Sequence, residues 1–148
     1  MEIVILDRLS ARDYEPKNNK TSIIRIYESS GDILSLKHDS KFKNVFTYRF
    51  DDIDVDIKNN VSEKLYGISP DCAKQIIEDF KNIKDNTDTL IVHCMAGISR
   101  SPAIAFALNE IFNLESLDKN DFFDGKKYGN YNRYVYSMML RTIYGNMI

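Results

Sequence analysis

The sequence predicts a single α/β domain in which a central, mostly parallel sheet is flanked by helices. Short β-favouring segments alternate along the chain with segments of helical spacing, and this alternation is typical of layered α/β folds. Residues 89–94 (TLIVHC) are nearly all apolar, as expected for a central strand covered on both faces. The 148 residues have the size of one domain and contain no repeat or linker, so we treat 1–148 as one domain.

The first third of the chain predicts three strands and one short helix or turn. Residues 2–6 (EIVIL) and 21–29 (TSIIRIYES) are rich in β-branched residues. Residues 44–50 (NVFTYRF) alternate apolar and polar side chains, as in a strand with one buried face. Between the first two strands, residues 10–16 form a turn or short helix that ends at a proline.

The remaining elements are mostly helical. Residues 51–68 predict an acidic segment followed by a loop. Ser69 is a plausible N-cap and Pro70 suits the first position of a helix. An apolar stripe at helical spacing then follows: Ile76, Ile77, Phe80 and Ile83. Residues 100–113 predict a strongly buried helix, and 131–143 a final one.

Composition and charge exclude several classes of protein. With 43% hydrophobic residues the chain can bury a core, and its net charge of −2 gives no argument for nucleic acid or an anionic membrane as partner. No apolar run is long enough to span a bilayer, and the first ten residues lack signal-peptide character, so a soluble, cytoplasmic protein is expected. Cys72, Cys94, His38 and His93 lack the spacing of a zinc site, and we expect neither metal nor cofactor.

The segment after the apolar strand predicts an anion-binding loop. Cys94 ends that strand, and the helix begins at Arg100. In an open α/β sheet, ligands bind beyond the carboxyl ends of the strands. The backbone N–H groups of a short loop and the N-terminus of the following helix converge on one point. The intervening residues are Met95, Ala96, Gly97, Ile98 and Ser99, and they are therefore predicted to bind a phosphate.

Particular side chains suit this loop to nucleophilic chemistry. Gly97 permits a turn conformation that a side chain would resist, and Arg100 offers two parallel hydrogen bonds to an oxyanion. Because cations and helix N-termini stabilise a thiolate, the thiol of Cys94 is predicted to ionise readily. Ser101 would donate a hydrogen bond to this sulfur, and His93 would order the loop from behind.

The stretch HCMAGISRS, residues 93–101, resembles the signature loop of the cysteine-dependent protein tyrosine phosphatases, in particular the small dual-specificity branch. The signature covers nine residues, and the order of elements is similar over most of the chain. The resemblance implies that Cys94 is the nucleophile, that residues 95–100 bind phosphate and that Ser101 stabilises the thiolate as it leaves. It also implies a metal-independent reaction through a phosphocysteine, on phosphotyrosine or on phosphoserine and phosphothreonine as well.

The resemblance further implies an aspartic acid upstream of the cysteine as proton donor. The run FDDIDVD offers Asp51, Asp52, Asp54 and Asp56, all beyond a predicted strand end. In small family members the acid follows an apolar strand residue after one intervening residue, and Asp52 has that spacing. We therefore choose Asp52 and keep the other three as alternatives. Neighbouring carboxylates raise one another's pKa, which would help to keep one of them protonated.

The acidic run has a competing interpretation as a calcium loop. Asp52, Asp54, Asp56 and Glu63 have the spacing of four ligands in a twelve-residue calcium loop. That loop requires glycine at its sharp turn, where this chain has Ile57, and a strand instead of a helix precedes the run. The sequence therefore disfavours calcium.

The expected partner is a phosphorylated protein or peptide. The loop side chains before Arg100 are uncharged, unlike the lysines of family members that act on inositol phospholipids, and no basic, aromatic-rich face suggests RNA. Two rival functions remain, a rhodanese-like sulfurtransferase and a module that binds phosphopeptides without turnover. Cys72 is expected to pack in a helix, or else to form a reversible disulfide with Cys94. Asn130 and Asn132 are expected to lie away from the site.

Overall fold

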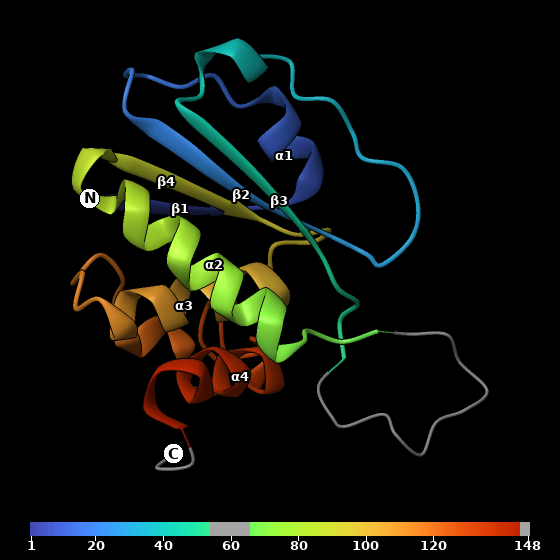
Figure 1. Ribbon diagram of the computed structural model, residues 1–148, viewed down its shortest axis with the longest axis vertical. Helices are drawn as coiled ribbons and strands as arrows, with labels where there is room; N and C mark the ends of the chain where they lie inside the picture. Colours follow the sequence, from blue (N-terminus) through green and yellow to red (C-terminus); the bar gives the residue numbers. More distant parts are fainter. Residues whose placement is uncertain (54–65, 146–148) are drawn as a thin grey trace.

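The computed structural model describes residues 1–53 and 66–145 and has an α/β architecture (Figure 1). Its four strands are β1 (Glu2–Leu6), β2 (Thr21–Tyr27), β3 (Asn44–Arg49) and β4 (Thr89–His93). They form one sheet in the order β1-β4-β2-β3, and every pair of neighbours is parallel. The predicted single α/β domain with a largely parallel sheet is confirmed, and the strand at 89–93 is central and fully buried as expected.

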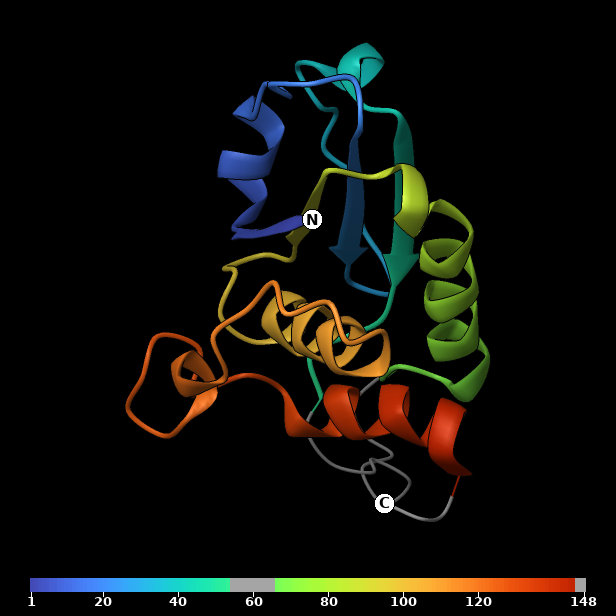
Figure 2. The same ribbon diagram turned by 90° about the vertical axis from the view of Figure 1, so that its left-hand side faces the viewer.

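Four α-helices surround the sheet: α1 (Arg8–Asp13), α2 (Pro70–Ile83), α3 (Arg100–Ile111) and α4 (Arg133–Tyr144). Short 3₁₀ turns lie at Asp39–Lys41, Lys84–Asn86 and Lys119–Phe122. In Figure 2, α1 lies on one side of the sheet and α2, α3 and α4 lie on the other. Helix α4 packs against both α2 and α3. No helix in the described ranges is long and apolar enough to cross a membrane.

Capping residues explain where the helices begin. The Ser69 hydroxyl accepts a hydrogen bond from the Cys72 N–H, and Pro70 follows, as predicted. Helix α1 begins at Arg8, two residues before the predicted start, because the Asp7 carboxylate caps it by accepting from the Ser10 N–H. Helix α4 begins at Arg133, two residues later than predicted, because Asn132 is its N-cap. In both cases a polar residue next to the periodic stretch decides the boundary.

Alternate strand residues divide between two cores, as the two-residue period of a strand requires. The larger core holds Ile24, Ile26, Leu90 and Val92 together with side chains of α2, α3 and α4. The smaller core, on the side of α1, includes Ile23, Ile91 and Ala11. Strand β3 is at the edge, and its exposure alternates along its length. Both faces of β4 are therefore covered, and its carboxyl end is fixed between β1 and β2.

The carboxyl ends of the parallel strands meet at one edge of the sheet. Beyond them come Arg8 after β1, Glu28 after β2, the 50–53 segment after β3 and Cys94 after β4. Polar residues that are distant in the sequence thus gather at one place.

Candidate active site

The loop between β4 and α3 holds the Cys94 thiol at its floor. Cys94 is only 2% exposed. Its Sγ accepts a hydrogen bond from the Gly97 N–H at 3.3 Å and lies 3.1 Å from the Ser101 hydroxyl oxygen. The predicted contact between Ser101 and the sulfur is confirmed. The sulfur thus has polar partners on the loop and in the first turn of α3.

The loop is fixed against the end of β1. Gly97 has a φ of +73°, and a Cβ built there would lie 2.9 Å from the carbonyl carbon of Leu6. The Arg8 N–H donates to the Met95 carbonyl oxygen at 3.0 Å. The glycine is therefore needed for two reasons, since a side chain would disfavour this backbone conformation and would also collide with the neighbouring strand.

His93 supports the loop from the core side, as predicted. Arg25, its register partner on β2, donates from Nε to the His93 Nε2 at 3.1 Å. Nε2 accepts, so the ring proton is on Nδ1, which faces the Cys94 carbonyl oxygen at 3.3 Å. Burial lowers the pKa of His93 to about 4, and the charges of Arg25, Arg8 and Arg100 act in the same direction. The imidazole is neutral near pH 7 and donates to the backbone of the nucleophile.

Arg100 is buried at the start of α3 and has an unused donor. It is 4% exposed, and its Nη1 donates to the Phe50 carbonyl oxygen at 2.9 Å. Its Nη2 lies 3.7 Å from a carboxylate oxygen of Glu28. Its Nε, also buried, has no hydrogen-bond partner in the described structure. A buried guanidinium donor without a partner is costly unless a ligand takes it up.

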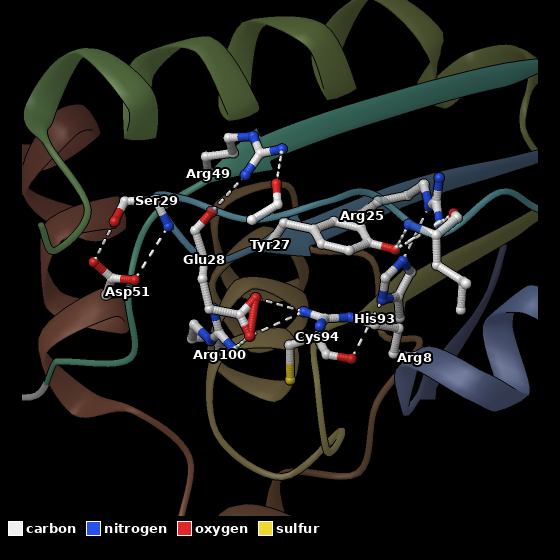
Figure 3. Close-up of polar contacts among 12 residues, drawn as sticks. Arg8, Arg25, Tyr27, Glu28, Ser29, Arg49, Asp51, His93, Cys94 and Arg100 are labelled. Carbon is white, nitrogen blue, oxygen red and sulfur yellow. Dashed lines mark hydrogen bonds and ion pairs between the residues drawn. The ribbon is translucent and has the colours of Figure 1, made fainter. Parts of the chain in front are cut away.

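Arg8 and Glu28 belong to this site, and the sequence reasoning missed both. Nη2 of Arg8 donates to both Glu28 oxygens, at 2.7 and 3.1 Å, and its guanidinium stacks 4.2 Å over the Tyr27 ring. Figure 3 shows Glu28 between Arg8 and Arg100. Burial raises the pKa of Glu28, but the hydrogen bond from Arg8 and the two arginine charges outweigh it and lower the pKa overall. Their positions directly beyond β1 and β2 are the signal that would have found them.

The two neighbouring aspartates beyond β3 have different surroundings. Asp51 is 7% exposed and accepts three hydrogen bonds, from the N–H and hydroxyl of Ser29 and from the Tyr66 N–H. Burial raises the pKa of Asp51, but these bonds and the charge of Arg100 lower it overall. The expectation that neighbouring carboxylates raise the pKa is therefore wrong for Asp51. The hydrogen bonds that its carboxylate accepts have the larger effect, and they lower its pKa. It is an ionised acceptor that holds two segments together.

Asp52 is exposed and lies over the loop. Its Oδ1 accepts a hydrogen bond from the Ser99 hydroxyl at 2.7 Å and another from Nδ2 of Asn132 at 2.8 Å. The expectation that Asn132 lies away from the site is therefore wrong. It failed because Asn132 caps α4, and the cap is brought against the signature loop only when α4 packs on α3.

A cavity of about 370 Å³ opens over Cys94. Its lining residues are Glu28, Asp51, Asp52, Cys94, Met95, Ala96, Ile98, Ser99 and Arg100. The predicted nucleophile, cation and acid therefore face one space, together with four of the predicted loop residues. Gly97, Ser101 and His93 support it from behind.

Other predicted residues lie elsewhere. Asp54, Asp56 and Glu63 are outside the described residues, so both the alternative acids and the calcium spacing stay open. Cys72 is half-buried in the first turn of α2 and packs against the larger core, as expected. Burial raises the pKa of the Cys72 thiol to about 11. A disulfide between Cys72 and Cys94 stays a prediction.

Across residues 1–53 and 66–145, no three His, Cys, Asp or Glu side chains gather as a metal site. No protein-family model matches the chain, and a search of curated proteins found no similar sequence. The arrangement at the sheet edge is therefore what carries the functional argument.

Proposed function

We propose that this protein is a metal-independent phosphate monoester hydrolase that acts on phosphotyrosine in proteins through a phosphocysteine intermediate. One observation carries the proposal. A buried cysteine sulfur that accepts from the Gly97 N–H and contacts the Ser101 hydroxyl shares a cavity with an exposed aspartate and with a buried arginine, whose Nε has no partner among the described residues. Nucleophile, anion site and proton donor are the three parts that such a hydrolysis needs.

In the first step, the Cys94 thiolate attacks phosphorus and the bond to the leaving oxygen breaks. The N–H groups of residues 95–100 and the guanidinium of Arg100 stabilise the equatorial oxygens as charge spreads over them. The Ser99 hydroxyl does not cap α3, so the first N–H groups of that helix stay available to the phosphate. Asp52 transfers its proton to the leaving oxygen.

In the second step, water attacks the phosphorus of the phosphocysteine and the sulfur–phosphorus bond breaks. Asp52, now ionised, accepts a proton from the attacking water. The hydroxyl of Ser101, 3.1 Å from the sulfur, stabilises the departing thiolate. Inorganic phosphate leaves, and the enzyme returns to its starting protonation state.

The rim of the cavity supports an aromatic substrate. Met95 and Ile98 are each 56% exposed and line the cavity beside Cys94. Such apolar side chains gain free energy by covering the ring of a phosphotyrosine. The same shallow cavity would also admit phosphoserine or phosphothreonine. The partner is a phosphorylated protein or peptide, and the proposed place of action is the cytoplasm.

The test is hydrolysis of para-nitrophenyl phosphate with a chelator present, over pH 5 to 8, by the wild type and by Cys94→Ser. We expect chelator-resistant, vanadate-sensitive hydrolysis that falls more than about a thousandfold in the variant, since the serine hydroxyl is a far weaker nucleophile here. A phosphotyrosine peptide should then be hydrolysed as well.

Two results would contradict the proposal. Tight phosphopeptide binding by a wild type that shows no turnover would indicate a binding module. Transfer of sulfur from thiosulfate to cyanide by a protein that leaves phosphate esters intact would indicate a sulfurtransferase. In both cases the Cys94 thiol must first be shown to be reduced.

A further inference from the structure

We propose that Asn132 is a positioning residue for the proton donor, because it fixes the Asp52 carboxyl so that Oδ2 carries the proton that reaches the leaving group. This inference rests on the proposed function. It adds a residue from α4, far from the signature loop in the sequence, and it assigns different tasks to the two oxygens of Asp52.

The hydrogen bonds at Asp52 are all on one oxygen. Oδ1 accepts from the Ser99 hydroxyl at 2.7 Å and from Nδ2 of Asn132 at 2.8 Å. A carboxyl oxygen has two lone pairs, so two donors saturate Oδ1. In the described parts of the chain no donor reaches Oδ2. A protonated Asp52 therefore has its hydrogen on Oδ2.

The orientation of the Asn132 amide is fixed by its own partners. Its Oδ1 accepts from the Val135 N–H at 2.9 Å, as the N-cap of α4. Its Nδ2 therefore points the other way, toward Asp52 and the Ile53 carbonyl oxygen, the latter at 2.9 Å. Asn132 is 3% exposed. A flipped amide would place two acceptors against each other and a donor against the Val135 N–H, so only one orientation satisfies all its partners.

Asn132 also ties the acid to the nucleophile loop. Its backbone N–H donates to the Ser99 carbonyl oxygen at 3.0 Å. Ser99 is the N-cap residue of α3, but its hydroxyl makes no capping bond and binds Asp52 instead. One asparagine thus links the start of α3, the start of α4 and the segment that carries the acid.

The Asp52 carboxyl has space beyond the cavity that holds Cys94. It also lines a second cavity, of about 360 Å³. Its lining residues are Asp52, Ser99, Asn130, Tyr131, Asn132 and Arg133. An exposed aspartate between two cavities has more than one rotamer open to it. The two bonds to Oδ1 hold one of these rotamers, in which no described donor occupies Oδ2.

The test compares Asn132→Asp and Asn132→Ser with the wild type on two substrates. Both variants keep an oxygen that caps α4, and both remove the amide Nδ2 that donates to Asp52, so either one suffices if the other does not fold. Asn130→Asp is the matched control, because it adds the same charge at an exposed position two residues away. Phenyl phosphate has a poor leaving group that needs the acid, and para-nitrophenyl phosphate has a good one that needs it far less.

We expect kcat/KM for phenyl phosphate to fall by about tenfold or more, and that for para-nitrophenyl phosphate by less than about threefold. Asn130→Asp should match the wild type on both substrates. In an Asp52→Asn background, Asn132→Asp should have no further effect, because the group it positions is already gone.

Other outcomes would overturn the inference. Equal losses on the two substrates, or a loss that adds fully to that of Asp52→Asn, would show that Asn132 only stabilises the fold. If the wild type shows no Cys94-dependent hydrolysis, the proposed function itself fails, and the positioning role fails with it. The two failures are distinguishable, since the first leaves wild-type turnover intact.

Discussion

At the floor of the cavity, His93, Cys94 and Arg100 are each at most 4% exposed, whereas Asp52 at the rim is exposed. The floor residues come from a central strand and the helix that follows it, so the core of the domain positions them. The rim residue lies beyond the edge strand β3 and is positioned by hydrogen bonds from two other segments. Packing therefore fixes the proposed nucleophile, and polar contacts fix the proposed acid.

Because of this difference, substitutions at the floor and at the rim should affect stability and activity to different extents. A buried group that is changed leaves unpaired partners or a cavity, so floor substitutions should lower the free energy of unfolding as well as activity. Substitution of an exposed rim residue leaves fewer unpaired buried groups and no cavity, so it should lower the free energy of unfolding less. Asp51, which is next to Asp52 in the sequence but buried, should behave like the floor.

The largest expected effect comes from Asp52→Asn. Loss of a general acid should lower kcat/KM for phenyl phosphate by roughly a hundredfold to ten-thousandfold, with little change in the free energy of unfolding. Steady-state kinetics, together with urea unfolding, measure both. An unchanged rate on this substrate would show that another residue supplies the proton.

The second largest effect should be a dependence of the free energy of unfolding on pH, caused by His93. Since the pKa of His93 is lowered from 6.5 to about 4 in the folded protein, the unfolded chain binds the extra proton first as pH falls. Stability is therefore complete above about pH 6.5 and falls by roughly 3 kcal/mol as pH decreases through 4. Urea unfolding between pH 4 and 7 measures this slope, which should flatten in His93→Asn. A wild-type slope that persists in the variant would place its origin elsewhere.

In contrast to Asp52→Asn, Asp51→Asn should lower the free energy of unfolding clearly and kcat/KM less. The new amide would face the Ser29 hydroxyl and the Tyr66 N–H, which now both donate to Oδ2 of Asp51. We expect a loss of about 2 kcal/mol in the free energy of unfolding and a smaller loss of kcat/KM on phenyl phosphate than for Asp52→Asn. If Asp51→Asn abolished turnover while unfolding like the wild type, the two aspartates would have to exchange roles.

The last of these effects, the smallest on the chemical step itself, should come from Gly97→Ala. The positive φ alone costs a non-glycine residue about 1–2 kcal/mol, and the clash with β1 moves the loop. Activity should fall mainly through a higher KM, because displaced loop N–H groups bind phosphate less well. Vanadate inhibition measures the same loss without turnover. Wild-type vanadate affinity in Gly97→Ala would show that the loop backbone is not the anion site.

Much of the fold could be predicted from local patterns. The strand at 89–93 stood out as a continuous apolar run, and Ser69-Pro70 marked the start of α2. Boundaries failed where a capping side chain was not recognised: Asp7 lies before the predicted segment, and Asn132 lies inside the predicted helix. An N-cap depends on one hydrogen bond from a polar side chain, and the pattern of apolar residues does not reveal that bond.

The candidate site was only half predictable, for a related reason. Cys94, Gly97, Arg100 and Ser101 are close in sequence, so their spacing between a strand and a helix carried the prediction. Glu28, just beyond β2, lines the same cavity, while Arg8 at the start of α1 binds Glu28 and Asn132 at the start of α4 binds Asp52. No local pattern connects these residues, since their proximity follows from strand order and from the packing of α4 on α3.

The sequence by itself determined an α/β domain and the grouping of Cys94, Gly97 and Arg100 between a strand and a helix, because hydrophobic period and short-range spacing are local properties. Tertiary structure alone decided that Asp51 is an ionised structural acceptor and that Asp52 is left exposed over the loop. It also decided that Asn132 faces Asp52. Two adjacent aspartates are chemically identical until the fold buries one among donors and leaves the other exposed.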